Sequence, residues 1–332
     1  MRRWRALRRW ESGLIALLAV VTVVGGITHP ALLGIYNLQT MALNNADLAL
    51  LAIGVAPVII TADIDISIAS MLALCGVLMA KLWTDGMDIW LAIAVAIALG
   101  AVLGLINGLF VVLLELPALA VTLGTMGAYT GAAFLILGGQ AIINLPQSLV
   151  TLGSGNIGGT QIPISLVVVL ALAAVLAFVI HLTSYGRSLF AVGANKQAAL
   201  FSGIPVVRVR LLAFVIAGVF SALAAVLYVG NYDTAQATIA SDQLLPAITA
   251  VILGGVSAYG GTGTIPGVVL AVVLLAVLQA ALGLAGLSGQ AQTIAVGAIL
   301  IIAIGAGAGI NAFTGLRRPR RRAAVSEQLG SG

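Results

Sequence analysis

Ten apolar stretches, each close to 20 residues long, follow one another along this chain of 332 residues. A helix needs about 20 such residues to cross the roughly 30 Å hydrocarbon core of a bilayer. Hydrophobic residues make up 61% of the chain and charged residues only 8%, whereas a soluble domain averages about 25% charged residues. We therefore expect an all-α polytopic membrane protein, a packed bundle of about ten transmembrane helices. The expected spans are residues 13–28, 41–60, 66–83, 90–114, 118–137, 162–180, 211–229, 243–258, 265–284 and 290–310.

The basic residues indicate which ends of the spans face the cytoplasm. Of the 15 Lys and Arg residues, five precede residue 10, five lie at 317–322 and four lie at 187–210, which leaves only Lys81 elsewhere. The positive-inside rule places these three clusters in the cytoplasm, and an even number of spans also puts both termini on one side. We predict a basic cytoplasmic N-terminus at 1–12, a transmembrane domain at 13–312 and a basic cytoplasmic tail at 313–332. The net charge of +5 does not indicate nucleic-acid binding, because the chain has no separate basic domain.

Residues 181–210, called the coupling segment below, form a basic stretch between two apolar runs. Within it, residues 196–201 favour helix, Asn195 is a suitable N-cap, and Gly203 with Pro205 ends the helix. This pattern predicts a short helix outside the bilayer, which we interpret as a docking surface.

Residue types that support catalysis are scarce. Cys75 is the single cysteine and lies in an apolar run, and the two histidines fall at opposite faces of the predicted bundle. The chain has neither a Ser-His-Asp arrangement nor a Gly-rich phosphate loop ending in Gly-Lys-Ser/Thr. We therefore expect no enzyme activity, no metal and no cofactor bound by this chain.

Polar residues within the expected spans are costly to insert in the membrane, so each of them is expected to have a functional or structural role. The candidates for lining a transport pathway are Asn44, Asn45, Asp47, Asp65, Ser67, Asn107, Thr122 and Thr125. Structural roles are the alternative. The two asparagines would cap the second span, and Asp65 with Ser67 would cap the third. Asn107 and Thr122 would make interhelical hydrogen bonds.

Two segments of the chain echo each other. Leu-Pro-Ala at 116–118 leads to Leu-Gly at 123–124 and Ala-Tyr at 128–129, while Leu-Pro-Ala at 245–247 leads to Leu-Gly at 253–254 and Ala-Tyr at 258–259. The two segments run in opposite directions in the predicted topology. Transporters are often built from inverted repeats, and either such a repeat or a coincidence of composition explains the echo.

Several blocks match one family pattern in order. The coupling segment contributes Gly186, Arg187, Ala191, Gly193, Asn195, Ala198, Ala199, Ser202, Gly203 and Ile204. The other blocks are Ile-Asp-Ile-Ser-Ile-Ala-Ser at 64–70, Ile-Asn-Gly at 106–108, Val-Thr-Leu-Gly-Thr at 121–125 with Gly-Gly-Gln at 138–140, and Ala-Val-Ile-Leu-Gly-Gly at 250–255 with glycines at 260, 261 and 263. From about residue 50 to residue 302 the chain resembles the inner-membrane permeases of bacterial ATP-binding-cassette importers for ribose and related monosaccharides, including autoinducer-2 and rhamnose systems. It departs from that pattern at Asp63 and Ala69, where the family usually or often has glycine.

This resemblance implies a non-catalytic permease subunit of the bacterial inner membrane, working with a second permease copy or a homologue. A separate cytoplasmic ATPase would bind ATP and Mg²⁺ and drive import. A periplasmic or lipid-anchored binding protein would deliver a monosaccharide or similar small polyol, either ribose-like, rhamnose-like or autoinducer-2. The coupling segment would insert into a cleft of the ATPase, with Ala198 and Ala199 as a small, close-packing face.

The resemblance also suggests a role for the most polar loop on the outer side. Its polar residues are Asn231, Tyr232, Asp233, Gln236 and Asp242. We interpret this loop as the contact for the binding protein, and a solvated loop is the alternative.

Two other classes of function compete with this interpretation. An ion-coupled secondary transporter of a small polar solute usually carries ionisable residues at the membrane centre, and the expected spans are nearly free of them. A structural scaffold would need neither an ordered cytoplasmic segment nor a bundle lined with polar groups. Both are therefore weaker explanations than a permease subunit.

Overall fold

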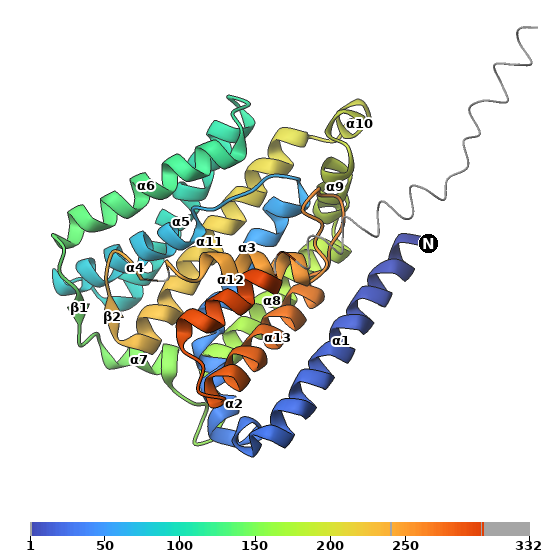
Figure 1. Ribbon diagram of the computed structural model, residues 1–332. Coiled ribbons are helices and arrows are strands. Elements are labelled where there is room, and N and C mark those ends of the chain that lie inside the picture. The colour runs from blue at the N-terminus through green and yellow to red at the C-terminus, as the bar shows by residue number, and fades with distance from the viewer. Residues whose placement is uncertain (1, 240, 300, 302–332) are drawn as a thin grey trace, which may run out of the picture.

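The computed structural model describes residues 2–239, 241–299 and 301 as a bundle of helices (Figure 1). Within this described part, six helices are long and apolar enough to cross a membrane. They are α1 (Arg2–Thr28), α5 (Ile89–Val112), α6 (Ala118–Leu137), α8 (Ile164–Leu182), α11 (Val206–Tyr232) and α13 (Ile265–Leu284). A seventh candidate is the pair α2 (Ile35–Asn44) and α3 (Ala46–Ile60), which meet at an angle of 45°. The helical membrane bundle expected from the sequence is confirmed.

The remaining elements are shorter. They are the 3₁₀ helix η1 (Pro30–Leu33), the helices α4 (Ile68–Thr84), α7 (Gln147–Ser154), α9 (Ser184–Ala194), α10 (Lys196–Phe201) and α12 (Leu244–Leu253), and the strands β1 (Ile142–Ile143) and β2 (Thr234–Ala235). The two strands pair antiparallel, with Ile142 opposite Ala235.

Four of the ten expected spans differ from the structure or extend beyond the described residues. The span expected at 66–83 is the helix α4, whose 17 residues are somewhat short of the about 20 needed to cross a membrane. The span expected at 243–258 contains only the ten helical residues of α12, which extend about 15 Å and reach halfway across the hydrocarbon. The chain leaves this helix at Gly254 and Gly255, and Gly255 has a positive φ of +87°. The span expected at 41–60 is broken at Asn45. The span expected at 290–310 is helical from 289 to 299, and most of its remainder lies outside the described residues, as does the predicted tail at 313–332.

The echo between residues 116–131 and 245–261 does not correspond to a repeated structure. Helix α6 continues through the whole Gly124–Gly131 part of the first copy. The second copy leaves α12 after Leu253 and forms turns. Pro117 precedes α6, whereas Pro246 lies inside α12.

Helices α3 and α11 form the centre of the bundle (Figure 1). Every residue of α3 is buried. Helix α11 packs closely on α5, because a Cβ built on Gly100 would lie 2.4 Å from the Gly218 carbonyl oxygen and one on Gly104 would lie 2.2 Å from the Phe214 carbonyl oxygen. Small residues permit such backbone contact between membrane helices, and the glycines at positions 100 and 104 of α5 leave room for it.

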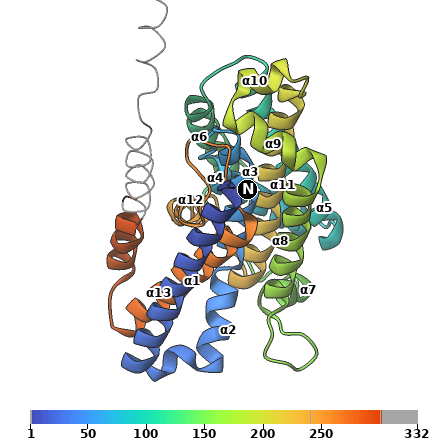
Figure 2. The same cartoon turned by 90° about the vertical axis from the view of Figure 1, so that its right-hand side faces the viewer.

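The bundle has two distinct ends, which Figure 2 shows at the top and toward the bottom. We call the first the α10 end; it comprises α9, α10 and the loops 61–67 and 254–264. We call the second the α7 end; it comprises α7, the two strands and the loop 233–243. The start of α1 belongs to the α10 end, because Trp10 Nε1 donates to the Leu253 carbonyl (2.8 Å) and Thr264 Oγ1 donates to Glu11 (2.6 Å). The helix that carries the N-terminal arginines and the coupling segment therefore share one end.

Candidate coupling and transport sites

The coupling segment folds as two consecutive helices, α9 and α10, at one extremity of the bundle (Figures 1 and 2). Asn195 separates them and caps α10, since its side-chain oxygen accepts from the Ala198 N–H at 3.0 Å. Gly203 follows α10 with a φ of +76°, a conformation that glycine adopts without strain. The predicted cap and the predicted end of this short helix are both confirmed.

The exposed face of α10 is formed by other residues than expected. Ala199 is only 4% exposed, because the helix turns this residue onto the rest of the chain, so it cannot offer a free packing face. Ala198 is exposed as expected. Two apolar residues that the sequence interpretation did not select, Leu200 and Phe201, are 61% and 88% exposed. Their position at the end of a short capped helix, in a segment expected outside the bilayer, was the available signal.

The other predicted coupling residues divide between surface and contact positions. Arg187, Asn195, Ser202 and Gly203 are exposed, Ala191 is half-buried, and Gly186 is buried. Gly193 lies against two loops, since a Cβ built there would come within 1.8 Å of the Ile60 carbonyl oxygen and 2.6 Å of the Gly261 nitrogen.

A buried charged cluster ties the coupling segment to the loop 61–67. The carboxylate of Asp63 accepts from Arg210 Nε at 2.8 Å and Nη2 at 2.9 Å, and from Lys196 Nζ at 3.3 Å. Thr61 Oγ1 adds a hydrogen bond of 3.1 Å. The Asp63 side chain is 5% exposed, that of Arg210 12% and that of Lys196 41%. Asp63 drew notice in the sequence only as a departure from the family pattern, and its partners 133 and 147 residues away carried no local signal.

The next carboxylate of the same loop, Asp65, begins a chain of buried polar groups. Its Oδ1 accepts from the Ser67 N–H (2.9 Å) and from Ser67 Oγ (2.7 Å), and Asn107 Nδ2 donates to Ser67 Oγ (2.8 Å). Tyr129, which the sequence interpretation did not select, donates from its hydroxyl to Asn107 Oδ1 (3.1 Å). Asp65 accepts from a backbone N–H just before α4 as expected, but Ser67 makes no side-chain cap, and its hydroxyl donates to Asp65 instead. The expected hydrogen bond of Asn107 to a neighbouring helix is confirmed.

Thr122 and Thr125 lie on α6 beside this chain. Thr122 is buried, and its Oγ1 is 3.3 Å from the Ile64 carbonyl oxygen and 2.9 Å from the Ala118 carbonyl oxygen. The first contact joins α6 to the loop 61–67, so the hydrogen bond expected between two helices is instead one between a helix and a loop. Thr125 Oγ1 is 3.4 Å from the Thr122 carbonyl oxygen. The eight pathway candidates therefore separate into this group and a second group around Asp47.

The second group lies at the break between α2 and α3. Asn44 is exposed and Asn45 half-buried, whereas Asp47 is 2% exposed. Among the described residues, Asp47 Oδ2 is buried without a hydrogen-bond partner. Asn45 makes no side-chain cap on α3, in contrast to expectation, because its amide donates to the Met41 carbonyl at 2.9 Å.

The polar loop at the α7 end lies beside this break. Asn231 Nδ2 is 3.5 Å from Asn44 Oδ1. Gln236 and Asp242 are exposed. Asp233 has a positive φ of +50° and accepts from the Leu145 N–H at 2.7 Å, so its carboxylate fastens two loops together.

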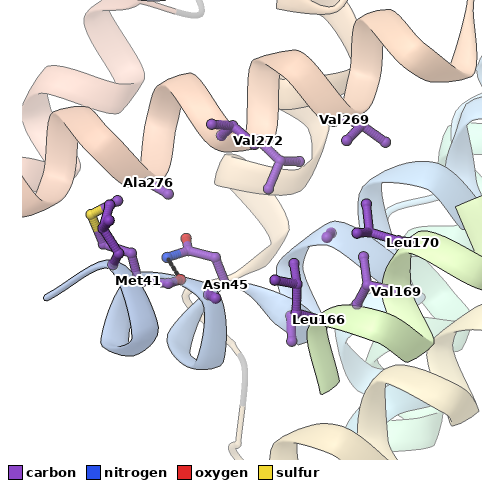
Figure 3. A pocket seen from close by; sticks show the side chains of 13 residues that line it. Met41, Asn45, Leu166, Val169, Leu170, Val269, Val272 and Ala276 are labelled. Carbon is purple, nitrogen blue, oxygen red and sulfur yellow. Dashed lines mark hydrogen bonds between the residues drawn. The ribbon is translucent and has the colours of Figure 1, made fainter. Parts of the chain in front are cut away.

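A cavity of about 200 Å³ opens between α2, α3, α8 and α13. Figure 3 shows Asn45 and Met41 beside apolar residues such as Val169 and Val272. Asn45 is the single polar side chain of the lining, and its amide is engaged with Met41. Such a lining cannot satisfy the hydroxyl groups of a sugar, so we place no polar substrate in this cavity.

Comparison with known proteins defines the family of the chain. Residues 37–304 match the family described as "Branched-chain amino acid transport system / permease component". The chain is 33% identical over 301 residues to the autoinducer 2 import system permease protein LsrD of Escherichia coli strain K12, Escherichia coli O157:H7 and Shigella flexneri. Each alignment covers 89% of this chain and 91% of the relative.

No solved structure matches the chain significantly. The family match nevertheless extends over most of the transmembrane bundle and includes the coupling segment, the loop 61–67 and the polar group around Asp47. The chain therefore belongs to this family of importer permeases and is the membrane-spanning subunit of an ATP-binding-cassette import system.

Proposed function

We propose that this permease imports a small polyol, either autoinducer-2 or a monosaccharide. A separate ATPase drives import by binding α10 on the cytoplasmic side. The similarity to autoinducer 2 import permeases supports the substrate class. The shared location of the α1 start and the coupling segment supports a cytoplasmic α10 end, because their basic residues then obey the positive-inside rule.

The exposed pair Leu200 and Phe201 is the observation that carries the proposal. A six-residue helix projecting from the bundle gains nothing by presenting a phenylalanine that is 88% exposed, unless another surface covers it. Aromatic residues inserted in a partner's pocket dominate many interfaces. The basic side chains Arg187 and Arg208 are exposed on the same segment and suit an acidic rim around such a pocket.

The division of labour follows from this arrangement. The ATPase supplies the ATP and Mg²⁺ site, and this chain supplies the pathway together with a second permease copy or a homologue. At the α7 end, a periplasmic or lipid-anchored binding protein contacts the exposed residues Tyr232, Gln236 and Asp242.

The group around Asp47 is the proposed first contact of the substrate. Carboxylates and amides hydrogen-bond the hydroxyls of a polyol, and Asp47 has a carboxylate oxygen that no described residue satisfies. Asn44, at the end of α2, and Tyr232, at the end of α11, are exposed. A broken transmembrane helix is a common location for a transporter's binding site.

One specific observation favours the alternative function, an ion-coupled secondary transporter. Asp47 and Asp65 are buried, and each has one carboxylate oxygen without a partner among the described residues. Buried carboxylates of this kind carry protons or ions in secondary transporters. Membership of an importer-permease family favours the ATP-driven function instead.

Replacement of Phe201 by Glu tests the proposal. The residue is exposed, so the bundle should insert normally, while a buried unpaired charge at the interface should weaken ATPase binding by about tenfold or more. Co-purification of the ATPase with the membrane complex measures this. Ile157→Glu is the matched control, because Ile157 is an exposed apolar residue near α7. Wild-type ATPase binding by Phe201→Glu would refute the role of α10.

A further inference from the structure

The Asp63 cluster connects elements that must move together if α10 is driven by an ATPase. Lys196 is the first residue of α10, Arg210 lies in the first turns of α11, and Asp63 lies in the loop between α3 and α4. The guanidinium binds both carboxylate oxygens, a fork geometry that fixes direction as well as distance. A displacement of α10 therefore acts on the loop 61–67 through the ion pair of Lys196 with the buried Asp63 carboxylate.

Backbone contacts reinforce this connection. The Gly261 N–H donates to the Ile60 carbonyl at 2.9 Å, and Gly193 at the end of α9 presses on both residues without space for a side chain. Gly260 also lies close to Ala62, since a Cβ built on it would lie 2.8 Å from the Ala62 Cβ. Packed interiors transmit displacement rather than absorb it.

The loop 61–67 leads directly to the buried polar chain. Asp65 follows Asp63 by two residues, and its carboxylate holds Ser67, which in turn holds Asn107. The chain ends at Tyr129 on α6, a helix that buries only Thr122, Tyr129 and Ala133. A shift of Asp63 thus reaches a hydrogen-bonded line that joins α4, α5 and α6.

We propose that Asp63, Arg210 and Lys196 form a transmission joint that converts movement of α10 into rearrangement of the Asp65–Ser67–Asn107–Tyr129 chain, which gates the pathway. This inference rests on the proposed function, since it needs an ATPase bound at α10. The three residues are positioning residues, because they act on the gate through the loop 61–67 and do not touch the substrate.

The test measures how much substrate enters for each ATP hydrolysed. The complex with its ATPase and binding protein is reconstituted in liposomes, and uptake is followed with labelled autoinducer-2 or ribose, whichever the wild-type complex imports. The double variant Asp63→Asn with Arg210→Gln removes both buried charges. It leaves no buried charge without a partner, since the half-exposed amine of Lys196 can turn to water. We expect normal insertion and ATP hydrolysis, with uptake per ATP lowered by at least about threefold.

Asp85→Asn with Lys81→Gln is the matched control, because it removes an ion pair whose side chains are exposed (54% and 42%) and lie outside the coupling segment. It should keep the wild-type ratio. The inference is overturned if the double variant keeps that ratio, or if its uptake and hydrolysis fall in equal proportion, as a merely structural role would produce. Failure of the proposed function is distinguishable, because the wild-type complex would then show no uptake dependent on ATP.

Discussion

The two ends of helix α3 carry buried carboxylates in opposite circumstances. Beyond its last turn, Asp63 is matched by Arg210 and Lys196 and has both oxygens engaged. In its first turn, Asp47 is equally buried, yet one oxygen has no partner among the described residues. A satisfied carboxylate fixes the elements around it, whereas an unsatisfied one retains capacity for a ligand. Asp63 is therefore suited to transmit force and Asp47 to receive a polar solute.

The backbone follows the same division. At the α10 end, Gly193, Gly260 and Gly261 bring three segments into direct contact. At the α7 end, a two-residue strand pairing and the Asp233 carboxylate connect the loops, and the polar side chains of Asn44 and Gln236 are exposed.

The largest expected effect is that of Asp63→Asn as a single change. It leaves the guanidinium of Arg210, which is 12% exposed, without its carboxylate. Breaking one partner of a buried ion pair typically costs about 3–5 kcal/mol. We expect a large fall in the thermal unfolding temperature of the purified permease. If Asp63→Asn lowers the unfolding temperature no more than Asp47→Asn does, the proposed difference between the two ends of α3 is wrong.

Asp47→Asn should change the free energy of unfolding by no more than about 1 kcal/mol, because among the described residues no cation pairs with this carboxylate. If Asp47 receives a substrate hydroxyl, losing a hydrogen bond to a charged group should raise the half-saturating substrate concentration of uptake by about tenfold or more. ATPase co-purification should remain at the wild-type level. Uptake with unchanged concentration dependence would remove Asp47 from the pathway.

Gly193→Ala tests the close backbone contact with a single methyl group. Both Gly193 and Gly13 are helical, so alanine should favour each helix by a similar amount. The added Cβ meets the Ile60 carbonyl at position 193 and open space at position 13. We expect Gly193→Ala to destabilise by about 1–3 kcal/mol and Gly13→Ala to be neutral or stabilising, as measured by thermal unfolding. If the two variants change stability equally, the backbone at the Gly193 contact shifts to accept a side chain at little cost.

Asn195→Ala should have the smallest effect, because it removes one cap from an exposed helix. Loss of an N-cap costs about 1 kcal/mol, so ATPase binding should weaken by about fivefold while the bundle keeps its stability. Asn195→Ser retains a capping oxygen and should restore binding. If serine fails to rescue binding, the amide contacts the ATPase itself rather than ordering α10.

Local rules predicted much of the fold and less of the sites. The apolar runs located the long helices because each run is self-contained, and the Asn195 cap follows from residues three positions apart. The half-length helix α12 was missed because apolar residues continue past Gly254 and only the backbone turn ends the helix. The inward turn of Ala199 and the pairing of Asp63 with Arg210 depend on packing between distant segments, which no local pattern encodes.

Transport by the reconstituted chain tests the central claim most directly. Liposomes containing the permease with its ATPase and binding protein are compared with liposomes containing the permease alone, under ATP or under an imposed proton gradient. We predict uptake of autoinducer-2 or a monosaccharide only with the ATPase and ATP, unchanged when the proton gradient is collapsed. Uptake by the permease alone on an ion gradient would contradict the account and assign the buried carboxylates Asp47 and Asp65 to ion coupling.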